Sequence, residues 1–495
     1  MLFNSLTFLV YFLPASYLLF RLGAKHGQTQ TVCAILLAVS LGFYSWWSFR
    51  DLGIFITSVS FNFLIGQEIQ NSASDHLKKW LLRFGVALNL MLLGYFKYVG
   101  FFVGNFNALF GANLTAPAWL LPLGISFYTF QQIAFLADAR HSRTSESNPI
   151  RYALVFAFFP HLVAGPIVRY ADLRPQFERK EFLAWNLKNI NWGLCLFILG
   201  LAKKVLLADQ MAKYASPVFA EAYAGGSVSI FEAWGGSLAY TFQLYFDFSG
   251  YSDMAIGLAA LFNIELPRNF FSPYKASSII DFWRRWHMTL SHFLRDFLYI
   301  PLGGSRFGFT RQLGALMMTM LLGGLWHGAN WTFVAWGGLH GAFLICNHLW
   351  RKISSEEFRK SQAWTPIAYV LTFLLVNFAW VVFRAANFAT AARMIGAMLD
   401  FRRLALPEQF LNGAAKLHVP LTQFGFTGGA TLLSLEQIRW IAISGIICWC
   451  FKNAHDLTNQ LQTMWKPRYA LLMGVLFAYC MLQLNGFSEF IYFQF

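Results

Sequence analysis

The chain has 495 residues, of which 57% are hydrophobic and only 12% are charged, and its formal net charge at pH 7 is +15. An ordinary soluble domain carries about 25% charged residues, so this composition excludes a water-soluble enzyme and indicates a protein embedded in lipid. In such a protein, Lys and Arg in short loops mark the cytoplasmic side and its anionic headgroups, which explains the positive charge better than nucleic-acid binding does.

Apolar segments recur along the whole chain, and we count roughly a dozen that approach the ~20 residues needed to span a bilayer. Examples are 5–20, 31–47, 81–95, 119–136, 313–326, 331–349, 367–383, 438–451 and 469–484. Inside hydrocarbon the backbone must satisfy its own hydrogen bonds, so these segments are expected to be helices. The sequence therefore predicts an all-α, polytopic integral membrane protein. The first twenty residues lack a basic start and a cleavage site, so we interpret them as a retained helix.

No repeat or polar linker divides the chain, so we treat 1–495 as one domain with weak subdivision. Segment 1–115 reads as ordinary spanning helices, 116–350 as the catalytic core, 351–485 as C-terminal helices and 486–495 as an aromatic tail. In 116–350 the apolar runs are broken by Gly, Pro and charge, which membranes tolerate only where protein or a cavity covers them. The six cysteines lie in apolar runs without metal-type spacing, so we expect reduced core residues and no metal site.

The basic loops predict an orientation. Loops 140–151, 169–188 and 263–312 are rich in Arg and Lys, whereas 208–232 is not. The positive-inside rule then places the first three on the cytoplasmic face. Loop 452–468 also carries basic residues, so the tail beyond the last helix is expected to face outward.

Two segments carry buried ionisable groups among apolar residues. "FPHLVAGPIVRY" (159–170) reads as a broken helix in which His161 is structural. "QLYFDFSGYSDMAIG" (243–257) sets Asp247 and Asp253 among aromatic residues, where a carboxylate needs a partner or a proton. The two aspartates orient either a basic helix or the histidines discussed below; pairing with Arg284 or Arg285 is an equal alternative.

Segment 281–304, "DFWRRWHMTLSHFLRDFLYIPLGG", predicts an amphipathic helix. One stripe is apolar, and a second line at helical spacing contains Arg284, His287, Ser291 and Arg295. The polar line suits the entry of an anionic cofactor, with His287 near the reacting group. The alternative is an interfacial helix whose basic face meets phospholipid headgroups.

Segment 321–341, "LLGGLWHGANWTFVAWGGLHG", is the strongest candidate for chemistry. His327 follows an apolar helix and is flanked by Gly328, Ala329 and Asn330, which leave room for a reactant. An imidazole that is neutral near physiological pH is a natural general base. A core histidine bound to a carbonyl is the alternative. His340 and His348 on the next segment are expected to be structural.

These blocks, together with the terminal "FIYFQF", resemble the membrane-bound O-acyltransferase family, in particular its bacterial branch that acetylates alginate and other exopolysaccharides. The resemblance covers nearly the whole chain and is densest over 120–350. It implies spanning and re-entrant helices around a central funnel, with the essential histidine of the W-H-G motif at His327 and that of W-R-R-W-H at His287.

The resemblance further implies that no cofactor is bound and that cytosolic acetyl-CoA is the acyl donor. His327 is expected to deprotonate an acceptor hydroxyl while His287 orients or stabilises the oxyanion. Asn330, Arg284, Ser291, Asp247 and Asp253 are expected to support the substrate channel. A periplasmic partner resembling a serine hydrolase is implied, because this sequence contains no such domain; the polysaccharide would be reached indirectly, from the bacterial inner membrane.

The aromatic tail has two interpretations. Phe and Tyr suit the lipid–water boundary, so the tail is either an anchor or an arm on which Tyr492 carries the acetyl group as an ester. A phenol with a pKa near 10 needs a base to act as a nucleophile.

Other functions stay open at this point. Peptidoglycan O-acetylation and teichoic-acid D-alanyl transfer use similar sequence blocks, and a lipid-modifying acyltransferase is a weaker alternative. A transporter or channel would also contain broken helices and buried histidines, but no inverted repeat is evident.

Overall fold

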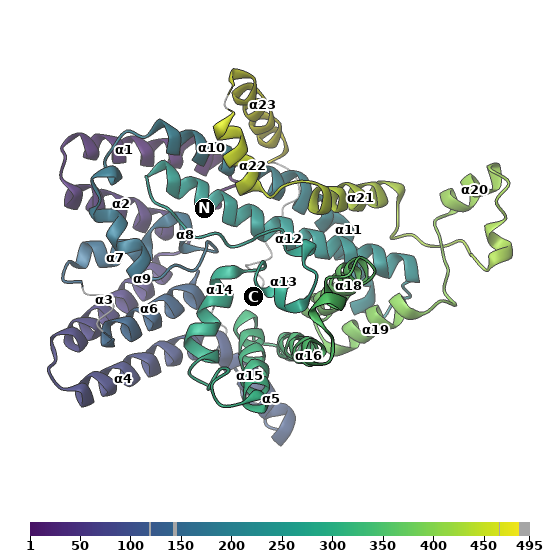
Figure 1. Cartoon of the computed structure of the whole chain (residues 1–495), viewed down its shortest axis with the longest axis horizontal. Helices are drawn as coiled ribbons and strands as arrows, with labels where there is room; N and C mark the ends of the chain where they lie inside the picture. Colours follow the sequence, from purple (N-terminus) through teal and green to yellow (C-terminus); the bar gives the residue numbers. More distant parts are fainter. Residues whose placement is uncertain (118–119, 142–145, 465, 485–495) are drawn as a thin grey trace. The chain divides into compact units, whose positions relative to one another are not determined.

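The computed structural model describes residues 1–117, 120–141, 146–464 and 466–484 (Figure 1). These residues form helices joined by loops, and their only β-type pairing is an isolated bridge between Ala405 and Thr427. The prediction of an all-α protein is confirmed. Tyr492 and the tail 486–495 lie outside the described residues.

The chain divides into two compact units that are interleaved along the sequence. The first unit contains residues 1–201, 251–269 and 454–484; the second contains residues 202–250 and 270–453. The expected subdivision of one domain at residues 116 and 350 stays a prediction.

The first unit is built from helices near both ends of the chain. Its elements are η1 (Thr7–Phe12), α1 (Leu13–Lys25), α2 (Thr29–Ser45), α3 (Phe49–Asn71), α4 (Asp75–Leu93), η2 (Gly94–Tyr98), α5 (Val99–Phe110), α6 (Ile125–Arg140), α7 (Pro149–Ala157), α8 (Phe159–Leu162), α9 (Tyr170–Leu173), η3 (Arg174–Glu178), η4 (Lys180–Phe182), α10 (Leu187–Ala202), α22 (Ala454–Thr463) and α23 (Pro467–Gln483). Side chains that precede the helices satisfy their first N–H groups, as Ser48 does for α3 and Asn148 for α7.

The second unit holds the middle of the chain. Its elements are η5 (Lys203–Ala208), α11 (Asp209–Ala224), α12 (Ile230–Leu261, which enters the first unit at Tyr251), η6 (Pro273–Lys275), α13 (Ile279–Trp283), α14 (Met288–Leu294), η7 (Arg295–Tyr299), α15 (Phe309–His327), α16 (Trp331–Ile353), α17 (Glu356–Arg359), α18 (Trp364–Arg384), α19 (Phe388–Leu399), α20 (Glu408–Lys416), η8 (Leu421–Phe424) and α21 (Leu435–Cys450).

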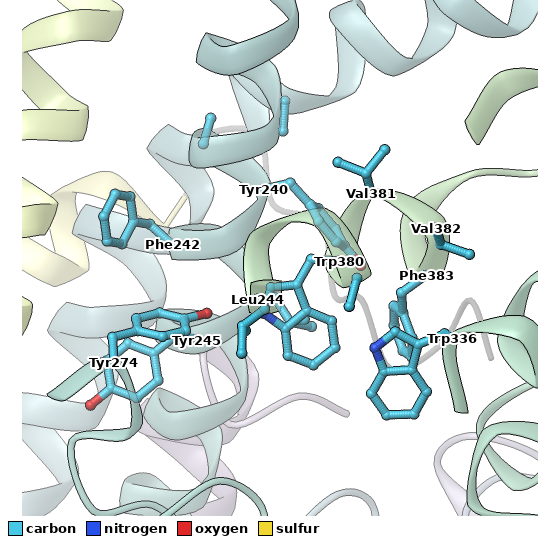
Figure 2. Close-up of a cluster of buried hydrophobic side chains, with 14 of the residues drawn as sticks. Tyr240, Phe242, Leu244, Tyr245, Tyr274, Trp336, Trp380, Val381, Val382 and Phe383 are labelled. Carbon is cyan, nitrogen blue, oxygen red and sulfur yellow. The ribbon is translucent and has the colours of Figure 1, made fainter. Parts of the chain in front are cut away.

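The core of the second unit is unusually aromatic. Figure 2 shows Trp336 beside Phe383, with Trp380 next to them and Tyr245 close to Tyr274. The ring centroids of Trp336 and Trp380 lie 5.5 Å apart in a stacked pair. These rings come from α12, α16, α18 and the loop before α13, so aromatic packing joins segments that are distant in the sequence.

Five stretches of the described chain are long and apolar enough to cross a membrane by length and composition. They are Thr7–Lys25, Phe49–Asn71, Asp75–Phe110, Leu187–Ala224 and Trp364–Arg384. The expected dozen is not reached by this criterion. Helices α15 and α16 have 19 and 23 residues, so length does not exclude them; their Gly, Trp and His residues make them less apolar. Four of the six cysteines are buried as expected, whereas Cys346 and Cys450 are exposed.

Candidate active site

Helices α15 and α16 of the second unit form a tight hairpin whose turn carries His327. The two helices can pack this closely because of two glycines. A Cβ on Gly324 would lie 2.2 Å from the carbonyl oxygen of Phe333, and a Cβ on Gly337 would lie 2.2 Å from the carbonyl oxygen of Met320. Only glycine permits this approach, as in other packed membrane helices. The glycine-broken sequence around His327 therefore brings two helices together and ends α15 at the histidine.

The His327 side chain is buried in a wall of aromatic rings. Its residue is only 7% exposed. The centroid of its ring lies 5.0 Å from Trp326, 5.1 Å from Trp336 and 5.5 Å from Phe383. Trp336 and Phe383 lie on α16 and α18, and no sequence motif indicated that they would line the site. Their rings exclude water from one side of the imidazole, where an electrostatic interaction is stronger than in bulk solvent.

His287 lies beside His327. The two ring centroids are 6.4 Å apart, with an angle of 62° between the planes. His287 is fully buried, and its ring meets Phe248 edge-to-face at 4.7 Å. The structure thus brings together the two histidines that the sequence analysis proposed as catalytic, although they are separated by forty residues of chain.

The backbone at His287 corrects the prediction for segment 281–304. Instead of one amphipathic helix, α13 ends at Trp283 and α14 begins at Met288, with His287 between them at φ 43° and ψ 53°. A non-glycine residue in this left-handed region is strained by about 1–3 kcal/mol, and such strain clusters at functional sites. The break turns His287 inward, whereas Arg284 and Arg295 remain exposed.

The surroundings of His287 also set its charge. Burial, followed by the nearby imidazole of His327, lowers the pKa of His287 well below its ordinary value of 6.5. His287 lies outside the five candidate membrane spans. A neutral imidazole keeps one N–H donor and one acceptor nitrogen, so it can orient a reactant or stabilise developing negative charge without carrying a charge itself.

Asn330 fixes the turn of the hairpin. Its Oδ1 accepts a hydrogen bond from the backbone N–H of Thr332 at 3.1 Å, which caps α16, and its Nδ2 donates to the carbonyl of Ala386 at 2.9 Å. Ala386 lies in the corner between α18 and α19. Asn330 therefore acts on the position of the site by tying the His327 turn to the end of α18.

The remaining predicted support residues are dispersed. Ser291 donates from Oγ to the carbonyl of Trp286 at 3.4 Å, beside the His287 break, whereas Arg295 pairs with Asp296 at 2.7 Å. Arg284 is an exposed residue at the end of α13. The predicted basic line thus does not exist as one face.

The two aspartates of α12 have partners other than the predicted Arg284 and Arg285. Asp247 lies 2.8 Å from Nζ of Lys204, which also lies 2.8 Å from Asp209, and all three side chains are buried. Arg285 pairs with Asp281. In the first unit, Asp253 lies 3.3 Å from Nε2 of His455, beside a cavity of about 320 Å³.

Two of the histidines that are expected to be structural, His340 and His161, make hydrogen bonds inside the fold. In the second unit, His340 is fully buried and its Nδ1 accepts a hydrogen bond from Nε1 of Trp283 at 3.3 Å, which joins α16 to α13. In the first unit, His161 donates from Nε2 to the carbonyl of Val155 at 2.9 Å.

Known proteins resemble this chain over most of its length. Residues 42–390 match the membrane-bound O-acyltransferase family. Over 533 aligned positions the chain is 37% identical to the peptidoglycan O-acetyltransferase of Helicobacter pylori, covering 100% of this chain and 98% of that protein. It is 41% identical over 408 positions to the "Probable alginate O-acetylase AlgI" of Azotobacter vinelandii, covering 81% and 78%. It is 28% identical over 290 positions to the teichoic acid D-alanyltransferase of Bacillus subtilis, covering 54% and 69%.

The family match includes both histidines, the hairpin that positions them and α18, whose Phe383 packs against His327. The family and the apolar helices together identify a membrane protein that acts as an enzyme, which removes the transporter or channel interpretation. The chain belongs to the membrane-bound O-acyltransferase family and is an O-acyltransferase.

Proposed function

We propose that this protein passes acetyl groups from cytosolic acetyl-CoA across the bacterial inner membrane for O-acetylation of an exported polysaccharide, alginate or a similar exopolysaccharide. The observation that carries the proposal is the pair of buried imidazoles, His327 and His287, 6.4 Å apart at the turn of a membrane-type hairpin. The alginate O-acetylases among the relatives support the choice of acetyl group and polymer.

The position of His327 along α15 supports transfer toward the outer face. Helix α15 starts at Phe309, whose ring lies 3.2 Å from Nζ of Lys352 near the end of α16. That end of the hairpin is basic, and by the positive-inside rule it faces the cytoplasm. At 1.5 Å per residue, the 19 residues of α15 carry the chain about 28 Å to His327, most of the ~30 Å hydrocarbon thickness.

The chemistry is an acyl transfer. His327 accepts the proton of an acceptor hydroxyl, whose oxygen attacks the thioester carbonyl. As the tetrahedral intermediate collapses, the C–S bond breaks and the coenzyme leaves as a thiolate, which takes up the proton that His327 accepted. The N–H of neutral His287 stabilises the oxyanion. No resident cofactor is needed for these steps.

Tyr492 is the proposed first acceptor. Its phenol would receive the acetyl group near His327 and give it to a periplasmic partner resembling a serine hydrolase, because a phenyl ester is a better acyl donor than an alkyl ester. Replacing Tyr492 by Phe keeps an aromatic anchor and removes only the oxygen. We expect polymer acetylation to fall to background in Tyr492→Phe cells; unchanged acetylation would leave the tail as an anchor.

Two other acceptor polymers remain within the same reaction class. The full-length similarity to a peptidoglycan O-acetyltransferase favours peptidoglycan as the second candidate, and the weaker similarity to a D-alanyltransferase provides a third. Mass spectrometry of purified envelope polymers, from cells with and without this protein, tests the proposal. Acetyl esters on the exopolysaccharide that disappear with the protein support it; loss of D-alanyl esters or of peptidoglycan acetyl groups alone would replace it.

A further inference from the structure

A solvent-facing pocket of about 640 Å³ lies in the second unit, where the loop between α11 and α12 meets the end of α19. It is lined by Gly226, Val228, Arg393, Gly396, Ala397, Leu399, Asp400, Phe401, Arg402 and Arg403. Three arginines thus face a single carboxylate, so the lining has an excess of positive charge. The volume falls within the range of ligand pockets, roughly 300–1,000 Å³.

The three arginines are held by the fold in different ways. Arg393 donates to the carbonyl of Ala222 at 2.8 Å, and Arg403 donates to Oγ of Ser227 at 3.2 Å. Arg402 and Arg403 both pair with Asp400, at 2.8 and 3.4 Å. Each contact uses only part of a guanidinium group, which has five N–H donors in a planar fork that matches a carboxylate. The loop therefore presents several donors in preset positions.

An exposed aromatic ring lies among these cations. Phe401 is 73% exposed and follows Asp400 directly. An aromatic ring next to charged donors suits a ligand with both an apolar face and anionic groups. A uronate sugar has this combination, because the C–H groups of its ring form an apolar face and each ring carries a carboxylate.

Contacts along α18 and α19 connect the pocket to the His327 turn. Asn330, in that turn, is hydrogen-bonded to Ala386 in the corner that precedes α19. The pocket lies at the other end of this 12-residue helix, about 18 Å away at 1.5 Å per residue. Arg384, at the end of α18, lies over the rings of Phe219 on α11 and Tyr240 on α12, so the end of α18 contacts the two helices that flank the loop beside the pocket. In the proposed orientation, the His327 turn and the end of α18 face outward.

We propose that this pocket binds a carboxylate-bearing polysaccharide, a polyuronate chain, through the guanidinium groups of Arg393, Arg402 and Arg403 and the ring of Phe401. This inference rests on the proposed function and deepens it, because it assigns a polymer class and a direct contact between this chain and the polymer. Binding here would hold the acceptor polymer close to where the acetyl group leaves the membrane.

The test measures binding of a tetramannuronate to the full-length protein in nanodiscs, without acetyl-CoA. We expect saturable binding that weakens as salt rises, since exposed charge pairs are screened. The double substitution Arg402→Gln/Arg403→Gln should weaken binding about tenfold, the combined effect of two exposed ion pairs. Phe401→Ala should weaken it without changing the salt dependence.

Control variants and control ligands distinguish binding at this pocket from non-specific attraction to positive charge. Lys360→Gln/Lys416→Gln removes two exposed cations elsewhere and should leave tetramannuronate binding and acetyl-CoA consumption unchanged. A neutral tetrasaccharide should not bind. Equal binding of a tetraglutamate peptide would overturn the inference in favour of an acidic protein partner.

Measuring both tetramannuronate binding and acetyl-CoA consumption distinguishes failure of the polyuronate pocket from failure of the proposed function. If the wild-type protein consumes acetyl-CoA but does not bind tetramannuronate, the polyuronate pocket is wrong and the acetyl transfer stands. If it binds tetramannuronate with the expected arginine dependence but never consumes acetyl-CoA, the pocket stands and the proposed acyl donor is wrong.

Discussion

The Glu146 carboxylate of the first unit and the histidine pair of the second are both buried, yet they are held in opposite ways. Glu146 accepts hydrogen bonds from Arg151 at 2.5 and 2.8 Å, from Tyr170 at 2.6 Å and from the backbone of Asn148 at 2.8 Å. Aromatic rings surround His287 and His327.

We expect this difference to distinguish a structural group from a reactive one. A carboxylate surrounded by donors is fixed as an anion and stabilises the fold around it. An imidazole among rings keeps a low charge, and an approaching substrate meets little competition from water. We therefore expect changes at Glu146 to affect stability and changes at the histidines to affect catalysis.

The largest expected effect is that of His327→Ala. Loss of the general base should reduce the release of free coenzyme A from acetyl-CoA by about 10³-fold, while the melting temperature changes little. Thiol release by purified protein in detergent measures the rate. His161→Ala is the matched control, because it removes another buried histidine and should lower the melting temperature without a specific loss of turnover.

The left-handed backbone conformation at His287 limits which substitution can test the role of its side chain. Ala would add strain at φ 43°, whereas Asn tolerates the left-handed region. His287→Asn should therefore isolate the loss of the imidazole, with kcat reduced about 10²-fold and KM for acetyl-CoA little changed. A change in KM alone would assign His287 to donor binding instead.

Glu146→Gln should show the opposite pattern. It leaves Arg151 and Arg174 without their buried carboxylate, which costs about 3 kcal/mol in stability, whereas turnover per folded molecule should stay constant. Glu178→Gln is the control, since Glu178 contacts the same two arginines but is 40% exposed. Equal melting temperatures for the two variants would contradict the structural role of Glu146.

Low pH should reduce the stability that the Glu146 carboxylate and its hydrogen-bond donors contribute to the fold. Burial alone would raise the pKa of Glu146, but the hydrogen bonds from Arg151, Tyr170 and the backbone of Asn148 outweigh it and lower the pKa to about 2. Because the folded-state pKa is lowered, the unfolded state takes up protons first as pH falls. The contribution of the Glu146 carboxylate to stability is fully present above pH 4.5, the ordinary pKa of a glutamate. It is lost as the pH falls from about 4.5 to about 2. Melting curves across this range should show a steeper loss for wild type than for Glu146→Gln.

The sequence predicted the helical class and the family because these depend on composition and on local blocks such as W-H-G. The structure brings His287 and His327 together, and their catalytic roles stay a prediction. It did not predict the break at His287, since the apolar spacing of 281–304 also fits one continuous helix. The strained backbone follows from tertiary packing against Phe248 and Phe270, which local spacing does not encode.

The sequence pattern also did not predict which distant residues would pair with the buried aspartates. Lys204 is the partner of Asp247, and His455 is the partner of Asp253, across 43 and 202 positions of chain. A buried aspartate requires a partner, but nothing in its own segment identifies which cation packs beside it. Phe383 and Trp336 were missed for a related reason, because an aromatic residue in an apolar helix resembles any other core residue.

The most direct measurement uses proteoliposomes with labelled acetyl-CoA on the cytoplasmic side only and the periplasmic partner with polymer on the other side. We expect labelled acetyl esters on the outer polymer with wild-type protein and none with His327→Ala of equal abundance and melting temperature. Equal labelling by the two proteins would contradict the role of His327 in carrying out the transfer.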